Sequence, residues 1–125
     1  MIDKNYPITI TGRVIKGSGD GKKMGIPTAN IEFKHNLKTI TQGVYSTRIK
    51  IDKKKYFGIS HYGPRYVFNE TTPQLEIHIL DFDQDIYGKI VEIELLGFIR
   101  PTMKFKNTEE MLKQIDKDIA EVKRG

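Results

Sequence analysis

The chain has 125 residues, 38% of them hydrophobic and 30% charged, as expected for one globular domain spanning residues 1–125. It contains no cysteine, which excludes disulfides, thiolate-bound zinc, iron–sulfur clusters and thiol nucleophiles. The net charge of +5 suits a polyanionic ligand, either a nucleoside triphosphate or a nucleic acid. The sequence has no apolar signal region and no run of about 18 apolar residues, so we expect a cytoplasmic protein without a membrane segment.

The first predicted element is a strand over residues 8–15, where β-branched residues mix with small and polar ones. A glycine-rich loop at residues 17–21 follows and cannot remain regular. Pro27 fixes its own φ and pushes the residue before it into extended geometry. We therefore expect Thr28 and Asn30 to be held in a defined, extended segment.

A hairpin is expected in the middle of the chain. Residues 43–51 form a strand with one apolar face, residues 52–55 a solvated turn, and residues 56–62 the returning strand. The connection at residues 63–73 contains two prolines, a glycine and an asparagine. Its irregular length suggests a functional role.

Residues 75–80 alternate as a half-buried strand should, so that Glu76 and His78 point away from its apolar face. Another strand is predicted over residues 89–99, after a turn.

The convincing helix comes last. Asn107 can cap it, Glu110 can complete a capping box, and apolar residues then recur at helical spacing. Short antiparallel strands followed by one helix predict a mainly β fold, a closed or nearly closed barrel with a C-terminal helix.

Two parts of the sequence could support phosphate chemistry. In the glycine loop, backbone N–H groups can approach phosphate oxygens, and Lys22 or Lys23 can offset negative charge. Thr28 and Asn30 then offer the hard oxygen atoms that Mg²⁺ prefers. Glu76 could accept the proton of an attacking hydroxyl. Spacing alone leaves ordinary alternatives open: a mobile turn, polar strand positions and a solvated carboxylate.

Taken in order, these motifs resemble those of the riboflavin kinase family. Residues 12–17 and 19–30 are similar to its G-x-V-x-x-G and G-x-G-x-x-x-G-[FI]-P-T-A-N patterns. The motifs GVY, E-x-H-[IL]-L-D-F and D-[LI]-Y-G-K are matched by residues 43–45, 76–82 and 85–89. Arg100, Phe105 and the terminal helix complete a resemblance that covers nearly the whole chain.

The resemblance implies a six-stranded antiparallel Greek-key β-barrel and transfer of the ATP γ-phosphate to the 5′-hydroxyl of riboflavin, giving FMN and ADP. It implies that Glu76 is the general base and that Mg²⁺ binds at Thr28 and Asn30. Riboflavin would lie across the barrel near Arg100, Phe105 and Tyr87, although a packing role for Tyr87 stays open. ATP would contact Gly17, Gly19, Gly21, Lys22, Lys23, Gly25, Pro27, Thr28 and Asn30.

One segment departs from the family pattern. Bacterial members usually carry N-I-G-x-[RK]-P-T-F, whereas residues 60–68 read S-H-Y-G-P-R-Y-V-F and keep Gly63, Arg65 and Phe68. We therefore expect a differently shaped loop beside the flavin. The 125 residues also leave no room for the adenylyltransferase domain of many bacterial members, so we expect the reaction to stop at FMN. We also expect a monomer.

Two other functions stay open. A flavin-binding regulatory module that no longer transfers phosphate would keep Arg100 but relax Thr28, Asn30 or Glu76. A basic β-barrel that binds single-stranded nucleic acid would use the 6 Tyr, the 6 Phe and the positive charge. The basic clusters lie in predicted turns rather than among aromatic residues, so we expect riboflavin and ATP, not nucleic acid or a membrane, as partners.

Overall fold

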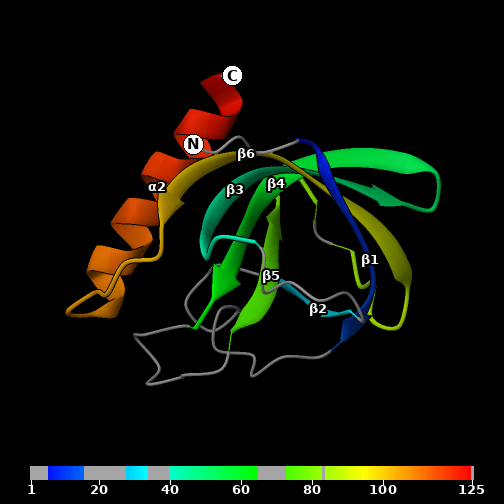
Figure 1. Ribbon diagram of the computed structural model, residues 1–125, viewed down its shortest axis with the longest axis horizontal. Helices are drawn as coiled ribbons and strands as arrows, with labels where there is room; N and C mark the ends of the chain where they lie inside the picture. The colour runs from blue at the N-terminus through cyan, green and yellow to red at the C-terminus, as the bar shows by residue number, and fades with distance from the viewer. Residues whose placement is uncertain (1–5, 16–27, 34–39, 65–72, 83, 125) are drawn as a thin grey trace.

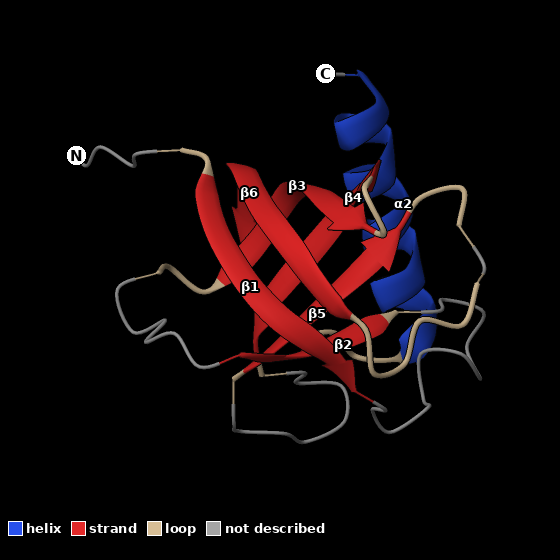
Figure 2. Cartoon of the chain, turned by 90° about the vertical axis from the view of Figure 1, so that its right-hand side faces the viewer, coloured by secondary structure: helices blue, strands red, loops and turns tan. Residues whose placement is uncertain are grey.

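A computed structural model describes residues 6–15, 28–33, 40–64, 73–82 and 84–124. The described strands and helix are β1 (Ile8–Ile15), β2 (Ala29–Phe33), β3 (Gly43–Ile51), β4 (Lys54–Gly63), β5 (Gln74–Ile79), β6 (Ile90–Pro101) and α2 (Thr108–Arg124). The strands close into one antiparallel barrel in the order β1-β2-β5-β4-β3-β6. Helix α2 packs against the outside of the barrel, which confirms the predicted fold (Figures 1 and 2).

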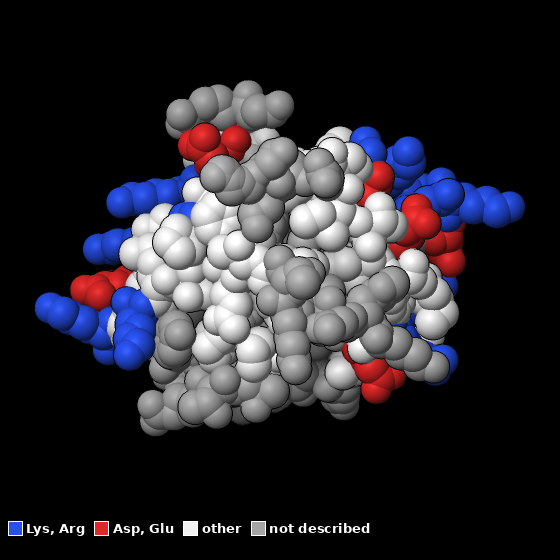
Figure 3. Space-filling view, viewed as in Figure 1, with Lys and Arg blue, Asp and Glu red and all other residues white. Residues whose placement is uncertain are grey.

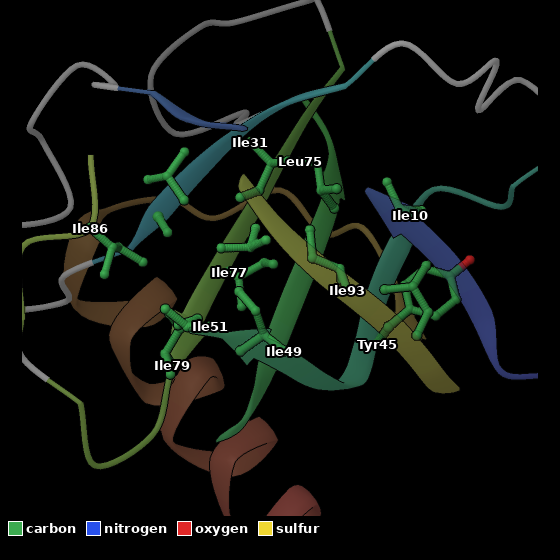
Figure 4. Close-up of a cluster of buried hydrophobic side chains, with 14 of the residues drawn as sticks. Ile10, Ile31, Tyr45, Ile49, Ile51, Leu75, Ile77, Ile79, Ile86 and Ile93 are labelled. Carbon is green, nitrogen blue, oxygen red and sulfur yellow. The ribbon is translucent and has the colours of Figure 1, made fainter. Parts of the chain in front are cut away.

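The core lies inside the barrel and is built mainly from isoleucine (Figure 4). Ile10, Ile49, Ile77 and Ile93 are each at most 2% exposed. Their branched side chains favour strand geometry, and burying each one stabilises the fold by about 2 kcal/mol relative to leaving it exposed. Because the sheet closes on itself, its strands have no open edge along which another chain could pair.

The β3–β4 turn is tighter than the sequence predicted. Asp52 and Lys53 both have positive φ, at 50° and 72°, and these two residues complete the turn. A two-residue turn with positive φ at both positions matches the right-handed twist of the flanking strands. Lys54 and Lys55 therefore belong to β4, where they pair with Ile51 and Lys50, and placing them in the turn was wrong.

Helix α2 begins where the capping pattern predicted. The Glu110 N–H donates to Asn107 Oδ1 at 2.9 Å, and the Lys106 N–H donates to Glu110 Oε1 at 3.2 Å. The second bond comes from the residue before the cap rather than from the cap itself, but it satisfies an N–H at the same helix end. No helix in the described part of the chain is long and apolar enough to cross a membrane.

Candidate active site

Glu76 lies on the outer face of β5 and is nevertheless buried. Its neighbours Leu75 and Ile77 point into the core, so its side chain points outward, as alternation predicted. Yet Glu76 is only 7% exposed. The Thr28 hydroxyl donates a hydrogen bond to Glu76 Oε2 at 3.2 Å. The carboxylate is therefore shielded from solvent and has a fixed partner on one of its oxygens.

The pairing of β2 with β5 brings the predicted metal ligands to this carboxylate. Asn30 is the direct register partner of Glu76, and Thr28 reaches it across a separation of 48 residues. Asn30 Oδ1 is buried and has no hydrogen-bond partner among the residues that the structure describes. A buried amide oxygen beside a hydroxyl and a carboxylate is a set of hard oxygen donors that fits Mg²⁺. Thr28, Asn30 and Glu76 thus form one site on the outer face of the barrel.

His61 is a neighbour of this site that the sequence interpretation missed. It lies on β4 as the direct register partner of Glu76, on the side of β5 opposite to Asn30. Local periodicity assigns a residue to a strand face but does not reveal which distant strand lies beside it. The available signal was weak, because His61 stood out only as part of the segment that departs from the family pattern.

These residues belong to a longer line of outward-facing positions, which we call the outer row. The register pairs run from Asn30 to Glu76, His61, Val44 and Arg100, on β2, β5, β4, β3 and β6. Neighbouring strands are about 4.8 Å apart, so three steps separate Glu76 from Arg100 by about 14 Å along the sheet. Arg100 therefore lies at the same level of the barrel as Glu76 without touching it.

The guanidinium of Arg100 fastens α2 to β6. Its Nε and Nη2 donate to the Asp118 carboxylate, at 3.0 Å to Oδ1 and 2.8 Å to Oδ2, and its Nη1 donates to the Pro101 carbonyl at 3.1 Å. Gln114 Nε2 also donates to Asp118 Oδ1 at 3.2 Å. The ion pair is well buried, with 14% of the Arg100 side chain and 3% of the Asp118 side chain exposed. A flavin contact by Arg100 stays a prediction and would use the plane of the guanidinium, since its N–H groups face these oxygens.

A groove of about 1030 Å³ is lined by residues of α2, of the strands β3, β4 and β6, and of the segment after β5. Its walls combine exposed aromatic rings, Phe57 and Phe98, with Leu80 and Val122, and both residues of the Arg100–Asp118 pair line it. Apolar side chains beside polar groups in a concave surface are typical of small-molecule sites in general.

The other two predicted flavin contacts are far from each other. Phe105 is half-buried in the segment between β6 and α2, at the Arg100 end of β6. Tyr87 is 55% exposed in the turn before β6, where its N–H donates to Asp85 Oδ1 at 3.0 Å. The 12-residue strand β6 therefore separates Tyr87 from Arg100. The structure does not bring Tyr87 to the other candidates, and its flavin contact stays a prediction.

Several predicted residues lie outside the described part of the chain, among them the ATP candidates Gly17, Gly19, Gly21, Lys22, Lys23, Gly25 and Pro27. The same holds for Arg65 and Phe68 of the departing segment. Gly63 of that segment is described, and its φ of 147° is rarely adopted by other residues. A Cβ at Gly63 would lie 2.8 Å from Thr102 Cγ2, which explains why glycine is kept there.

Fold and site together define a small antiparallel barrel domain with an acidic site on its outer face. The family model for riboflavin kinase (flavokinase) matches residues 4–125. The chain belongs to the riboflavin kinase family.

Two similar proteins are larger than this chain. The trifunctional protein RibF/MnmA of Mycoplasmoides gallisepticum is 43% identical over 112 residues, covering 90% of this chain and 17% of its own length. The bifunctional riboflavin kinase/FMN adenylyltransferase of Haemophilus influenzae is 37% identical over 118 residues, covering 94% of this chain and 38% of its own length. The chain thus spans well under half of either relative.

Solved structures share the fold. A macrolide-efflux protein from Streptococcus pneumoniae superposes with a TM-score of 0.84 and 29% identity, over 95% of this chain and 39% of that one. Riboflavin kinase from Trypanosoma brucei superposes with a TM-score of 0.70 and 23% identity, over 98% of this chain and 81% of that one. At this low identity, the second likeness establishes the shared fold alone.

Proposed function

We propose that this chain is a riboflavin kinase, which transfers the γ-phosphate of ATP to the 5′-hydroxyl of riboflavin and releases FMN and ADP. The observation that carries the proposal is the meeting of Thr28, Asn30 and Glu76 on neighbouring strands, in a chain that belongs to this family. A flavin-binding module without activity would have no need to keep all three together.

Glu76 is proposed to be the general base. Its carboxylate accepts the proton of the 5′-hydroxyl as that oxygen attacks the γ-phosphorus, and the bond between the γ-phosphorus and the bridging oxygen of ADP breaks. The hydrogen bond from the Thr28 hydroxyl to Oε2 restrains the carboxylate on the side that faces the predicted metal ligands. Burial of Glu76 keeps competing water away from the reacting atoms.

Thr28 Oγ1 and Asn30 Oδ1 are proposed to hold Mg²⁺ together with oxygens of the nucleotide. Mg²⁺, when bound, offsets the negative charge that the phosphoryl group carries during transfer. We expect Asn30→Ala to raise the Mg²⁺ concentration for half-maximal activity about tenfold, equivalent to losing about 1.4 kcal/mol of binding. Glu32→Ala is the matched control, because Glu32 lies two residues further along β2 and is exposed. An unchanged Mg²⁺ requirement in the Asn30 variant would remove it from this role.

The flavin is proposed to lie along the outer row, with its ribityl chain at Glu76 and its ring toward the Arg100 end. The separation of about 14 Å between these positions suits a ligand with a hydroxyl at one end and a flat ring at the other. A guanidinium plane stacks favourably on such a ring, and Phe105 lies at the same end of β6.

The decisive experiment is a coupled assay of ADP release with and without riboflavin, in the presence of ATP and Mg²⁺. We expect Glu76→Gln to slow turnover by about 100-fold or more while leaving riboflavin affinity within about twofold, because only the proton acceptor is lost. Glu92→Gln, an identical change on an exposed position of β6, should leave turnover unchanged. Tight riboflavin binding without ADP release would indicate the inactive module instead.

The charge distribution gives no specific support for a nucleic-acid function. On the face shown in Figure 3, Lys and Arg gather at two opposite ends, over α2 and over the β3–β4 hairpin, with Asp and Glu among them. The described atoms between these ends are mostly uncharged. The expected lack of a nucleic-acid partner, the monomeric state and the cytoplasmic location stay predictions. Binding of a labelled oligonucleotide that weakens steeply with salt would contradict the first of them.

A further inference from the structure

The Asp118 carboxylate fixes the plane of the Arg100 guanidinium. Nε lies 3.0 Å from Oδ1 and Nη2 lies 2.8 Å from Oδ2, so one edge of the guanidinium meets both carboxylate oxygens. A planar group held by two such bonds cannot rotate its plane without breaking one of them. Nη1 is held separately by the Pro101 carbonyl at 3.1 Å. Arg100 is therefore held in one orientation, both from α2 and from its own strand.

The carboxylate is itself held in place. Gln114 lies one helical turn before Asp118 on α2, and its Nε2 donates to Oδ1 at 3.2 Å. Oδ1 thus accepts from Gln114 and Arg100, while Oδ2 accepts from Arg100. Only 3% of the Asp118 side chain is exposed, so water has little access to these oxygens. The helix thus controls the direction of the guanidinium through two successive side chains.

Fastening α2 to the barrel does not by itself explain a buried ion pair. Burying two charges costs desolvation energy that their attraction roughly repays, and well-packed apolar side chains of similar volume often stabilise a fold as well or better. Ile115 and Ile119 of the same helix are half-buried and apolar. The pair of Arg100 and Asp118 therefore adds something that packing alone would not, which is a fixed direction of the guanidinium.

Two observations mark this guanidinium as part of a binding surface. Arg100 and Asp118 line the groove described above, together with the exposed ring of Phe98. A register shift in the pairing of β3 with β6 leaves Ile99 as an extra residue between Phe98 and Arg100. Such β-bulges are frequent next to active sites, where they re-aim a side chain.

We propose that Asp118 is a positioning residue for riboflavin, which holds the guanidinium of Arg100 so that its flat face lies against the flavin ring. One N–H edge of the guanidinium is occupied by Asp118, and the flat face is the part that can stack on a ring. The inference rests on the proposed function and adds to it a residue of α2 that acts through Arg100 and makes no contact with the reacting atoms.

Riboflavin affinity, measured from the quenching of flavin fluorescence by added protein, tests this role without requiring kinase activity. We expect Asp118→Asn to raise the Kd for riboflavin about tenfold, while the KM for ATP stays within about twofold. Asp116→Asn makes the same change at an exposed position of the same helix and should leave the Kd unchanged. Asn107→Ala weakens the cap of α2 without touching the ion pair, so it should lower stability but not riboflavin affinity.

A double-mutant cycle tests whether Asp118 acts through Arg100. Arg100→Lys keeps the charge but lacks the planar group, and we expect it to raise the Kd about tenfold. Adding Asp118→Asn to this variant should raise the Kd by less than about twofold more, because the group that Asp118 directs is already gone. If Asp118→Asn does not fold, Gln114→Met removes the donor to Asp118 instead, takes its place in both measurements, and should raise the Kd about threefold.

A Kd for Asp118→Asn equal to or below the original would overturn the proposal, as would an unchanged Kd for Gln114→Met where that variant replaces it. An equal rise in Kd for Asn107→Ala would also overturn it, because loosening α2 would then suffice. Effects of Arg100→Lys and Asp118→Asn that multiply to about a hundredfold would show that the two residues act independently, and would do the same. In each of these cases, normal riboflavin binding by the unsubstituted chain leaves the proposed function intact. An unsubstituted chain that binds no riboflavin would overturn the proposed function, and this inference with it.

Discussion

Asp118→Asn removes the negative charge from the buried ion pair that fastens α2 to β6. Only 3% of the Asp118 side chain and 14% of the Arg100 side chain are exposed, so solvent cannot replace the lost partner. Removing one member of a buried pair costs about 3–5 kcal/mol. Arg100 keeps its bond to the Pro101 carbonyl, and asparagine keeps one acceptor oxygen. We therefore expect a loss of about 3 kcal/mol in the free energy of unfolding.

The chain provides a matched control for this prediction. Lys89 Nζ lies 2.8 Å from Asp52 Oδ2, the same distance as in the Arg100–Asp118 pair, but 42% and 68% of these two side chains are exposed. An exposed pair of this kind contributes about 0–1 kcal/mol. Asparagine also tolerates the positive φ of Asp52, so Asp52→Asn adds no backbone strain.

Urea unfolding followed by circular dichroism measures both variants under identical conditions. We expect the free energies of unfolding to differ by about 2 kcal/mol or more between the two substitutions, with unchanged slopes. Equal losses, or a loss below about 1 kcal/mol for Asp118→Asn, would refute the argument that burial rather than distance decides the strength of these pairs.

Two further predictions concern stability. Burial, with a smaller contribution from Tyr6, raises the pKa of Tyr45 to about 12, whereas the unfolded chain has about 10. Because the pKa of Tyr45 is higher in the folded state, its contribution to the free energy of unfolding is complete below pH of about 10 and is lost as the pH rises from about 10 to about 12. Absorbance titration should show Tyr45 ionising well above pH of about 10. Asn107→Ala removes the acceptor for the Glu110 N–H and should cost about 1 kcal/mol in thermal unfolding, while Asn107→Ser should largely preserve stability.

Ionisation of all tyrosines near pH 10 would contradict the first prediction. Equal loss of stability in the alanine and serine variants would contradict the second, because serine is itself a good cap.

Local features of the fold were predictable from the sequence. Residues 43–51 form β3 as predicted, because a strand with one apolar face has a clear period of two. The start of α2 followed from the side chains of Asn107 and Glu110, which act on neighbouring N–H groups. The turn before β4 was predicted to be two residues longer than it is, because charged residues are common both in turns and at exposed strand ends.

The site was predictable only in part, because its contacts are non-local. Alternation placed Glu76 on the outer face, but the burial of that residue depends on the rest of the fold. Periodicity did not show that β2 and β4 flank β5, so the position of His61 was missed. Nor did it show that Asp118, on a helix turn far along the chain, would occupy the N–H groups of Arg100. Thr28 and Asn30 were grouped with Glu76 through family resemblance rather than through spacing.

The outer row has a consequence for how such a domain can diversify. The spacing between Glu76 and Arg100 is set by three hydrogen-bonded strand pairs of the closed barrel, and closure prevents those strands from sliding apart independently. Insertions in the loops leave this spacing intact. With the flavin placed along the outer row as proposed, a new loop would not change the length of the substrate that fits, whereas a change in strand number or register would.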